Sequence, residues 1–185
     1  FKFVNKIIVD PDNSNIIIVA TNKGVLKSIN GGLSWVKTYK RGYAVQDLVS
    51  NPKNKLVIYA AVNGLGVIKS YDQGETWVNS FDGLGEGGRF SLAISEVDTG
   101  YVFTSVETPS ETTDLFISTN SAKSWNQLND YDNSFIDFFN GQGWFNNIIA
   151  THPFESRKLF IGGVYLGQVE FKNTVSESSE QVMRI

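Results

Sequence analysis

Short apolar runs, each bounded by turn residues, recur along the chain and predict β-strands. Residues 16–19, 56–59 and 159–161 are such runs, and each follows a turn that contains a proline. Proline presets φ for a turn and cannot donate a hydrogen bond to a strand ladder, so it marks the corner between two strands. Residues 94–98 occupy the same place in another repeat without proline. The pattern predicts repeated units of strand, tight turn and strand.

A degenerate octapeptide supplies a second repeat. It is Ser-Tyr-Asp-Gln-Gly-Glu-Thr-Trp at residues 70–77, and it returns in altered form at residues 28–35 and 118–125. The three tryptophans that close it lie 42 and 48 residues apart. This spacing is close to the roughly 40–50 residues of one four-stranded propeller blade. The chain is therefore predicted to be a repeat protein in which each repeat forms one blade.

The residue types of the octapeptide suit a hairpin between the third and fourth strands of a blade. An Asp or Asn side chain accepts N–H bonds across the turn, Gly tolerates a positive φ, and Trp buries a large ring between sheets. Stability alone explains these residues, so we assign them a structural role. The positions are Ser28, Asn30, Gly32, Trp35, Ser70, Asp72, Gly74, Thr76, Trp77, Ser118, Asn120 and Trp125.

The octapeptide resembles the Asp-box of the sialidase and BNR-repeat β-propellers, which has the pattern Ser/Thr-x-Asp-x-Gly-x-Thr-Trp. The middle copy matches in full, whereas Asn30 and Asn120 replace the aspartate in the other two. Residues 141–148 and 161–166 resemble stretches of large secreted bacterial propellers with BNR repeats. The resemblance implies an all-β fold, a β-propeller with four-stranded antiparallel blades, in a secreted or cell-surface bacterial protein.

We divide the chain into four predicted blades and a polar tail. The blades cover residues 1–38, 39–80, 81–128 and 129–171, and residues 172–185 form the tail. The fourth blade has no octapeptide. Propellers close with roughly 4–8 blades, and the families with Asp-boxes generally use the larger numbers. We therefore expect an arc of about four blades in a larger ring, completed by the remaining blades of the same chain.

Composition and charge narrow the function classes. Apolar residues make up 41% of the chain and aromatic residues 13%, which supports a packed core in one domain. The formal charge of −3 and the lack of a basic run give no electrostatic footprint for nucleic acid or an anionic membrane. No apolar run reaches the roughly 18 residues of a membrane span. The chain has no cysteine, which excludes disulfides and thiolate metal sites.

In a propeller, the inter-blade connections gather on one face and the octapeptide turns lie on the opposite face. Function is expected on the face of the connections. The connections near residues 40–43, 83–90 and 129–144 carry arginines, carboxylates and aromatic rings. Aromatic rings stack on sugars, and the charged groups hydrogen-bond to hydroxyls or carboxylates. The predicted ligand-binding residues are Arg41, Tyr43, Glu86, Arg89, Phe90, Asp132 and Trp144.

Catalysis is the alternative to binding. A sialidase needs three converging arginines. Arg157 lies in a predicted turn on the octapeptide face and Arg184 lies in the tail, so these two cannot complete such a triad. A glycoside hydrolase that resembles the xyloglucanases needs two carboxylates about 6.5–9.5 Å apart. The candidates for such a pair are Asp132, Asp137, Glu86 and Glu107. Because loops favour acidic residues anyway, we assign no catalytic residue.

The sequence predicts no metal and no cofactor. The only histidine, His152, occupies a strand corner where other repeats have Asp10 and Asn51, so we interpret it as a turn residue. Residues 10–15 offer oxygen ligands but lack the closing glutamate of an EF-hand loop.

These patterns predict a binding or interaction module without catalytic activity, with a carbohydrate or protein ligand on the connection face. One alternative is part of a glycoside hydrolase that resembles the xyloglucanases. Another is an assembly-factor or sortilin-like propeller that grips a peptide, which the aromatic, Asp-rich residues 129–146 favour. An open arc leaves two blades without a neighbour, so we expect it to aggregate or to pair with the missing blades.

Overall fold

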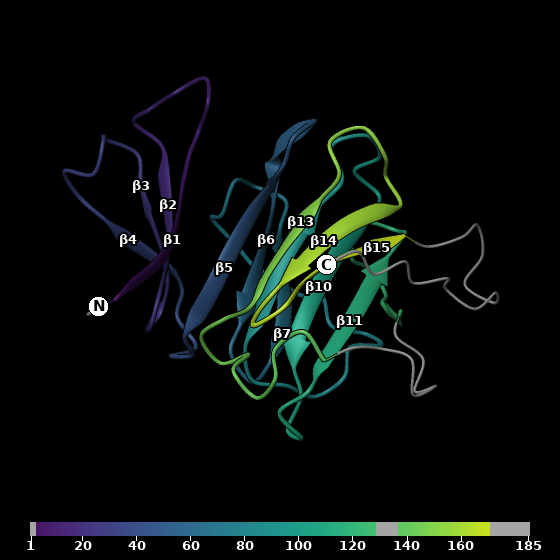
Figure 1. Cartoon of the computed structure of the whole chain (residues 1–185). Coiled ribbons are helices and arrows are strands. Elements are labelled where there is room, and N and C mark those ends of the chain that lie inside the picture. The colour runs from purple at the N-terminus through teal and green to yellow at the C-terminus, as the bar shows by residue number, and fades with distance from the viewer. Residues whose placement is uncertain (1–2, 129–136, 171–185) are drawn as a thin grey trace.

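The computed structural model describes residues 3–128 and 137–170, and this part of the chain folds into β-strands joined by turns. The strands form four antiparallel sheets that follow one another along the chain (Figure 1). We call these sheets blades 1 to 4. Asp132 and the predicted tail at residues 172–185 lie outside the described residues.

Each strand pairs with its neighbour in the chain, so every blade is a simple meander. Blade 1 contains β1 (Val4–Val9), β2 (Ile17–Thr21), β3 (Gly24–Ser28) and β4 (Val36–Tyr39). Blade 2 contains β5 (Val45–Asn51), β6 (Asn54–Val62), β7 (Gly66–Ser70) and β8 (Val78–Asn79). Blade 3 contains β9 (Phe90–Ile94), β10 (Val102–Glu107), β11 (Thr113–Ser118) and β12 (Asn126–Gln127). The described part of blade 4 contains β13 (Ile148–Thr151), β14 (Lys158–Gly162) and β15 (Leu166–Glu170).

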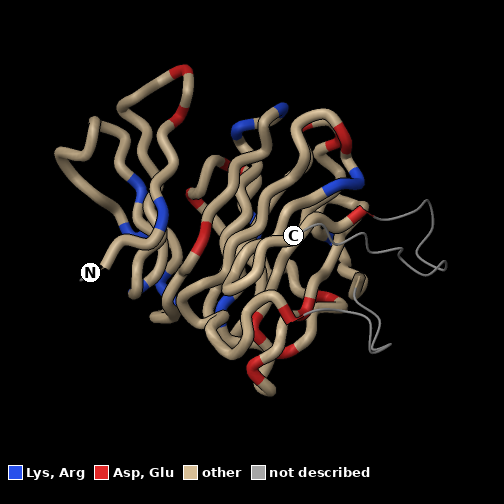
Figure 2. The backbone as a smooth tube through the Cα atoms, in the orientation of Figure 1, with Lys and Arg blue, Asp and Glu red and all other residues tan. Residues whose placement is uncertain are grey.

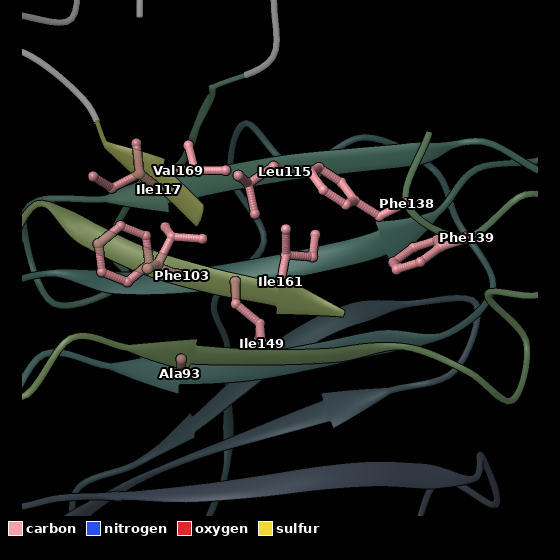
Figure 3. Packing of buried hydrophobic residues seen from close by; sticks show 10 residues of the cluster. Ala93, Phe103, Leu115, Ile117, Phe138, Phe139, Ile149, Ile161 and Val169 are labelled. Carbon is pink, nitrogen blue, oxygen red and sulfur yellow. The ribbon is translucent and has the colours of Figure 1, made fainter. Parts of the chain in front are cut away.

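The core lies between successive blades. Along β6, Ile58 and Ala60 pack against blade 1, whereas Tyr59 and Ala61 pack against blade 3. Both faces of such a strand are buried, so its sequence is a continuous apolar run instead of an alternation. Figure 3 shows the cluster between blades 3 and 4, whose labelled members are Ala93, Phe103, Leu115, Ile117, Phe138, Phe139, Ile149, Ile161 and Val169.

The first strands of the blades lie next to one another, since β1 contacts β5, β5 contacts β9, and β9 contacts β13. The blades are thus arranged around a common inner edge. One consequence is that the inter-blade connections and the second-to-third-strand hairpins share one face, which we call the loop face. The three octapeptide turns lie at the opposite ends of the strands, on what we call the octapeptide face.

The corners between first and second strands also lie on the octapeptide face, and each uses a side chain to close its turn. Asp10 Oδ1 accepts the N–H of Asp12 at 2.8 Å, and Asn51 Oδ1 accepts the N–H of Lys53 at 2.9 Å. His152 Nδ1 accepts the N–H of Phe154 at 3.2 Å, which is the turn role expected for this histidine.

The outer sheet faces of the two end blades are apolar and have no neighbouring blade among the described residues. On blade 1, Ile8 packs into the core, while Ile7 and Val9 point the other way and are exposed. On blade 4, Ile148 and Phe160 are exposed on the face opposite the core. We call these surfaces the outward faces of blades 1 and 4.

Candidate functional site

The three octapeptide turns share one hydrogen-bond pattern. In the middle turn, Ser70 Oγ accepts the N–H of Gly74 at 2.8 Å, and Asp72 Oδ1 accepts the N–H of Thr76 at 2.9 Å. The matching bonds elsewhere are Gly32 to Ser28 (2.9 Å), Ser34 to Asn30 (2.9 Å), Ala122 to Ser118 (2.8 Å) and Ser124 to Asn120 (3.0 Å). An asparagine amide oxygen therefore replaces the carboxylate without changing the turn.

These turns also join neighbouring blades. The indole N–H of Trp77 donates to Thr38 Oγ1 of blade 1 at 3.1 Å, and that of Trp125 donates to the Ser80 carbonyl of blade 2 at 2.7 Å. In the other direction, Lys69 Nζ of blade 2 donates to the Ser121 carbonyl of blade 3 at 2.7 Å. The octapeptide turns thus contribute hydrogen bonds to the assembly of neighbouring blades.

The structure gives the predicted ligand-binding residues different surroundings. Arg41 and Tyr43 are exposed between β4 and β5, and Glu86 lies in the connection between β8 and β9. Phe90 opens β9 and is only 1% exposed, within the core between blades 2 and 3. Its ring therefore offers no face on which a sugar could stack, contrary to the interpretation from sequence.

Two cavities of about 460 and 510 Å³ flank the connection at residues 83–87. They share the wall formed by Leu84, Gly85, Glu86 and Pro109. Gly83 is required here, because its φ is +83° and an added Cβ would lie 2.2 Å from the Trp125 carbonyl oxygen. The connection is pressed against blade 3, and Glu86 is the acidic side chain that both cavities share.

A second feature is the loop at residues 137–147 before β13, which we call the aromatic loop. Both of its ends are tied to blade 3. Asp137 Oδ1 accepts the hydroxyl of Thr113 at 2.8 Å, and Phe139 is fully buried. At the other end, the Asn147 side chain accepts the Ser105 hydroxyl at 2.5 Å and donates to the Arg89 carbonyl at 3.1 Å.

The middle of the aromatic loop presents apolar rings to solvent. Trp144 is 65% exposed and meets Phe145 edge to face, with ring centroids 4.2 Å apart and planes at 67°. An exposed pair of large rings on a tied loop is unusual, since apolar side chains of this size are ordinarily buried. Of the three predicted aromatic ligand-binding residues, Tyr43, Phe90 and Trp144, the most exposed is Trp144.

Carboxylates surround this loop, and Figure 2 shows acidic residues gathered at this end of blade 3. Glu107, the last residue of β10, is only 8% exposed. Burial raises the pKa of Glu107, and the charges of Glu111 and Asp137 raise it further, while the backbone N–H groups of Trp144 and Gly143 oppose these effects. The sequence placed Glu107 among four solvated acids; its burial depends on the aromatic loop folding over β10.

Arg89 lies across the ladder from Glu107, whose N–H donates to the Arg89 carbonyl at 3.1 Å. The Arg89 Nε is buried and has no hydrogen-bond partner in the described part of the chain. Within residues 3–128 and 137–170, no three acidic or histidine side chains are grouped to hold a metal ion. The same residues include no helix that is long and apolar enough to cross a membrane.

No protein-family model and no curated protein sequence matches the chain. Solved structures do match it. An ancestral GH74 enzyme is 21% identical with a TM-score of 0.67, and the match covers 91% of this chain and 22% of that one. YCF48 bound to D1 peptide is 16% identical with a TM-score of 0.58, and the match covers 89% of this chain and 48% of that one.

An auxiliary nutrient binding protein from Bacteroides thetaiotaomicron is 11% identical with a TM-score of 0.63, and the match covers 99% of this chain and 42% of that one. The chain thus spans less than half the length of each of these proteins. Identities this low establish the fold alone. The four consecutive antiparallel sheets and these similarities show an all-β chain with the β-propeller fold, as the sequence predicts.

Proposed function

We propose that this chain is a binding module without catalytic activity, an arc of a larger Asp-box propeller in a secreted or cell-surface bacterial protein. Its ligand, a carbohydrate or a protein segment, binds on the loop face between the aromatic loop and the connection at residues 83–87. The remaining blades of the same polypeptide complete the ring. The shared hydrogen bonds of the three octapeptide turns support the relation to Asp-box propellers.

The observation that carries the proposal is the exposed Trp144 ring on a loop tied at both ends. A ring held in place loses little conformational entropy when a ligand stacks on it, so a rigid exposed aromatic residue favours binding. Glu86 and the two cavities beside residues 83–87 add polar contacts on the same face. On the octapeptide face, the indole N–H groups of Trp77 and Trp125 are used in contacts between blades.

Two of the structural neighbours are named with a binding role or a bound ligand, and a third is named as a GH74 enzyme. One is named as a nutrient binding protein and another was solved with a bound peptide. Neither ligand is transferred to this chain, because the identities are 16% and 11%.

The test is a binding screen of the purified chain against immobilised glycans and against a peptide library. We expect a ligand from one of the two panels, and we expect Trp144→Ala to weaken its binding at least about tenfold, as for a lost stacking contact. The matched control is Phe154→Ala, which removes a ring that is 82% exposed on the octapeptide face. A ligand that loses affinity with Phe154→Ala and keeps it with Trp144→Ala would refute the proposed face.

A glycoside hydrolase is the second candidate, and Glu107 is the observation that favours it. A buried carboxyl group with a raised pKa is suited to donate a proton as a general acid, and Glu111 and Asp137 lie nearby as possible partners. Incubation with xyloglucan and other β-glucans tests this candidate. Release of reducing sugar by the wild type, abolished in Glu107→Gln, would support hydrolysis; intact polysaccharide would exclude it for these substrates.

A further inference from the structure

We propose that the outward face of blade 1 is an interaction surface for one further blade of the same polypeptide, and that this blade carries the polar residues with which blades 1 and 2 hold their next neighbours. This assignment rests on the proposed function, in which the chain is an arc of a larger ring. Two positions beside each octapeptide matter. The pre-turn position directly precedes the octapeptide, and the post-turn position lies three residues after its tryptophan. The pre-turn residues are Lys27, Lys69 and Ile117, and the post-turn residues are Thr38, Ser80 and Leu128.

In blades 1 and 2, the pre-turn residue is a buried lysine that reaches the octapeptide turn of the next blade. Lys27 is 6% exposed, and its Nζ lies 2.8 Å from Glu75 Oε1 of blade 2. Lys69 is 4% exposed, and its Nζ donates to the Ser121 carbonyl of blade 3 at 2.7 Å. A buried ammonium group without an acceptor is strongly unfavourable. Each lysine therefore suits a neighbour that offers an octapeptide turn.

The post-turn residue of these blades also meets the octapeptide of the next blade. The indole N–H of Trp77 donates to Thr38 Oγ1 at 3.1 Å, and that of Trp125 donates to the Ser80 carbonyl at 2.7 Å. The Ser80 hydroxyl in turn donates to the Ala122 carbonyl. The two interfaces between blades with octapeptides thus share two polar links, one from the pre-turn lysine and one at the post-turn residue.

Blade 3 lacks both of these residue types, and the blade that follows it lacks the octapeptide. Its pre-turn and post-turn residues, Ile117 and Leu128, both pack in the apolar cluster between blades 3 and 4. The sequence of blade 4 contains no octapeptide, so it brings neither a turn to receive a lysine nor an octapeptide tryptophan to be paired. The residues at the two positions of a blade therefore match the type of blade that comes next.

Blade 1 has an octapeptide that meets no preceding blade in the described part of the chain. There, the indole N–H of Trp35 makes no hydrogen bond, unlike those of the other two octapeptides. Gly74 of blade 2 is buried, and a Cβ added to it would lie 3.5 Å from Ile18 Cδ1 of blade 1, whereas the equivalent Gly32 is only half-buried. By continuity with the two existing interfaces, the blade that covers this face has a lysine at its pre-turn position. It has a serine or threonine at its post-turn position, next to Trp35.

A fifth blade fused to the full chain tests this pairing. Residues 39–89, which contain blade 2 and the connection that follows it, are duplicated directly before Phe3, so that the copy leads into blade 1. The matched control fusion has the residues of blade 3 at the two positions of the copy, Lys69→Ile and Ser80→Leu. The original blade 2 is unchanged in both fusions.

Hydrogen exchange of the Trp35 indole N–H, followed by NMR, is the measurement. A variant with Trp35→Phe identifies its signal. Exchange should be about tenfold slower in the first fusion than in the unfused chain, as for a new hydrogen bond of ordinary strength, and unchanged in the control fusion. The Trp125 indole N–H should stay protected in all three chains, which shows that blades 2 and 3 remain folded. Equal slowing in both fusions would refute the pairing, and no slowing in either would refute the surface.

A double-mutant cycle on the unfused chain tests the lysine link without any added blade. Glu75→Gln should lower the thermal unfolding midpoint in the wild-type background and leave it unchanged in a Lys27→Met background, because the lysine that Glu75 accepts is then gone. Equal effects of Glu75→Gln in the two backgrounds would show that the lysine does not read the neighbouring turn, and the pairing would fall.

This inference and the binding proposal fail separately. Protection of Trp35 by the added blade in a chain that binds no ligand removes the binding module and keeps the interaction surface. Ligand binding through Trp144, with no effect of either added blade on Trp35, removes the interaction surface alone.

Discussion

On the octapeptide face, three turns of different sequence make the same hydrogen bonds, whereas on the loop face each connection has its own length and its own contacts. The turn at residues 70–77 is closed by bonds between residues four apart, such as Thr76 to Asp72. The aromatic loop is held by bonds across long stretches of chain, such as Asn147 to Arg89. The repeated octapeptide thus supplies the contacts that join a blade to its neighbour. The candidate ligand contacts lie in the connections of the loop face, which differ from one repeat to the next.

The largest expected effect contrasts the two kinds of tryptophan. Trp125 is 3% exposed and donates to Ser80, whereas Trp144 is 65% exposed. Trp125→Ala should lower the free energy of unfolding by about 3–5 kcal/mol through loss of a buried ring, and Trp144→Ala should change it by less than about 0.5 kcal/mol. Urea unfolding monitored by circular dichroism measures both. Equal losses of unfolding free energy would show that Trp144 in the aromatic loop stabilises the fold as much as Trp125 in the octapeptide does.

The next effect concerns the outward faces of blades 1 and 4, which should drive self-association of the isolated chain. Phe160→Glu places a charge on the outward face of blade 4 and Ile7→Glu on that of blade 1, and Phe154→Glu is the control on an exposed turn. Each of the first two should weaken association at least tenfold, or about 1.4 kcal/mol, in sedimentation velocity. A monomeric wild type across the concentration range would show that neither face needs a partner.

Mixing the two face variants sharpens this experiment. If the outward face of blade 4 binds that of blade 1 in another molecule, each variant keeps one intact half and the mixture should regain association. If like faces pair, each variant should associate in the mixture only as much as it does alone.

A smaller effect is expected in the turn at residues 70–77. Asp72→Ala should cost about 1 kcal/mol because it removes the acceptor of the Thr76 N–H and hydroxyl, in the manner of a lost cap. Asp72→Asn should be close to wild type, since Asn30 and Asn120 make the same turn. Thermal unfolding at neutral pH compares the two, and a large loss in Asp72→Asn would show that the turn needs the charge.

The same residue predicts a dependence on pH. Burial opposes ionisation of Asp72, but hydrogen bonds from Thr76, Ser70 and Glu75 outweigh it and lower the pKa. A lowered pKa in the folded state means that the carboxylate stabilises the fold above the pKa of the unfolded chain. This contribution is lost as the pH falls through the folded-state pKa. Acid should therefore destabilise the wild type relative to Asp72→Asn, as measured by unfolding from pH 7 down to pH 2.

The smallest effect is expected at His152. His152→Asn keeps an acceptor for the Phe154 N–H, as Asn51 does for Lys53, and should change the unfolding free energy by less than about 0.5 kcal/mol. A large loss would mean that the imidazole has a second role, for instance with Glu155, whose Oε1 lies 3.6 Å from its Nε2.

The sequence by itself determined the repeat, the strands and the closure of the turns. The reason is that their interactions are local: an Asp, Asn or Ser side chain bonds to a backbone amide two to four residues away, and alternating residues of one strand face opposite blades. Such contacts depend on spacing along the chain, which the sequence displays directly. The structural role of Asp72 and the turn role of His152 could be predicted in this way.

Only the tertiary structure decided which residues of the loop face are buried. Phe90 and Trp144 both appear in the sequence as aromatic residues of connections, yet Phe90 lies in the core and Trp144 is exposed. Glu107 is buried because the aromatic loop, more than thirty residues later in the chain, folds over the end of β10. Burial of this kind results from packing between segments distant in sequence, and no local pattern records it.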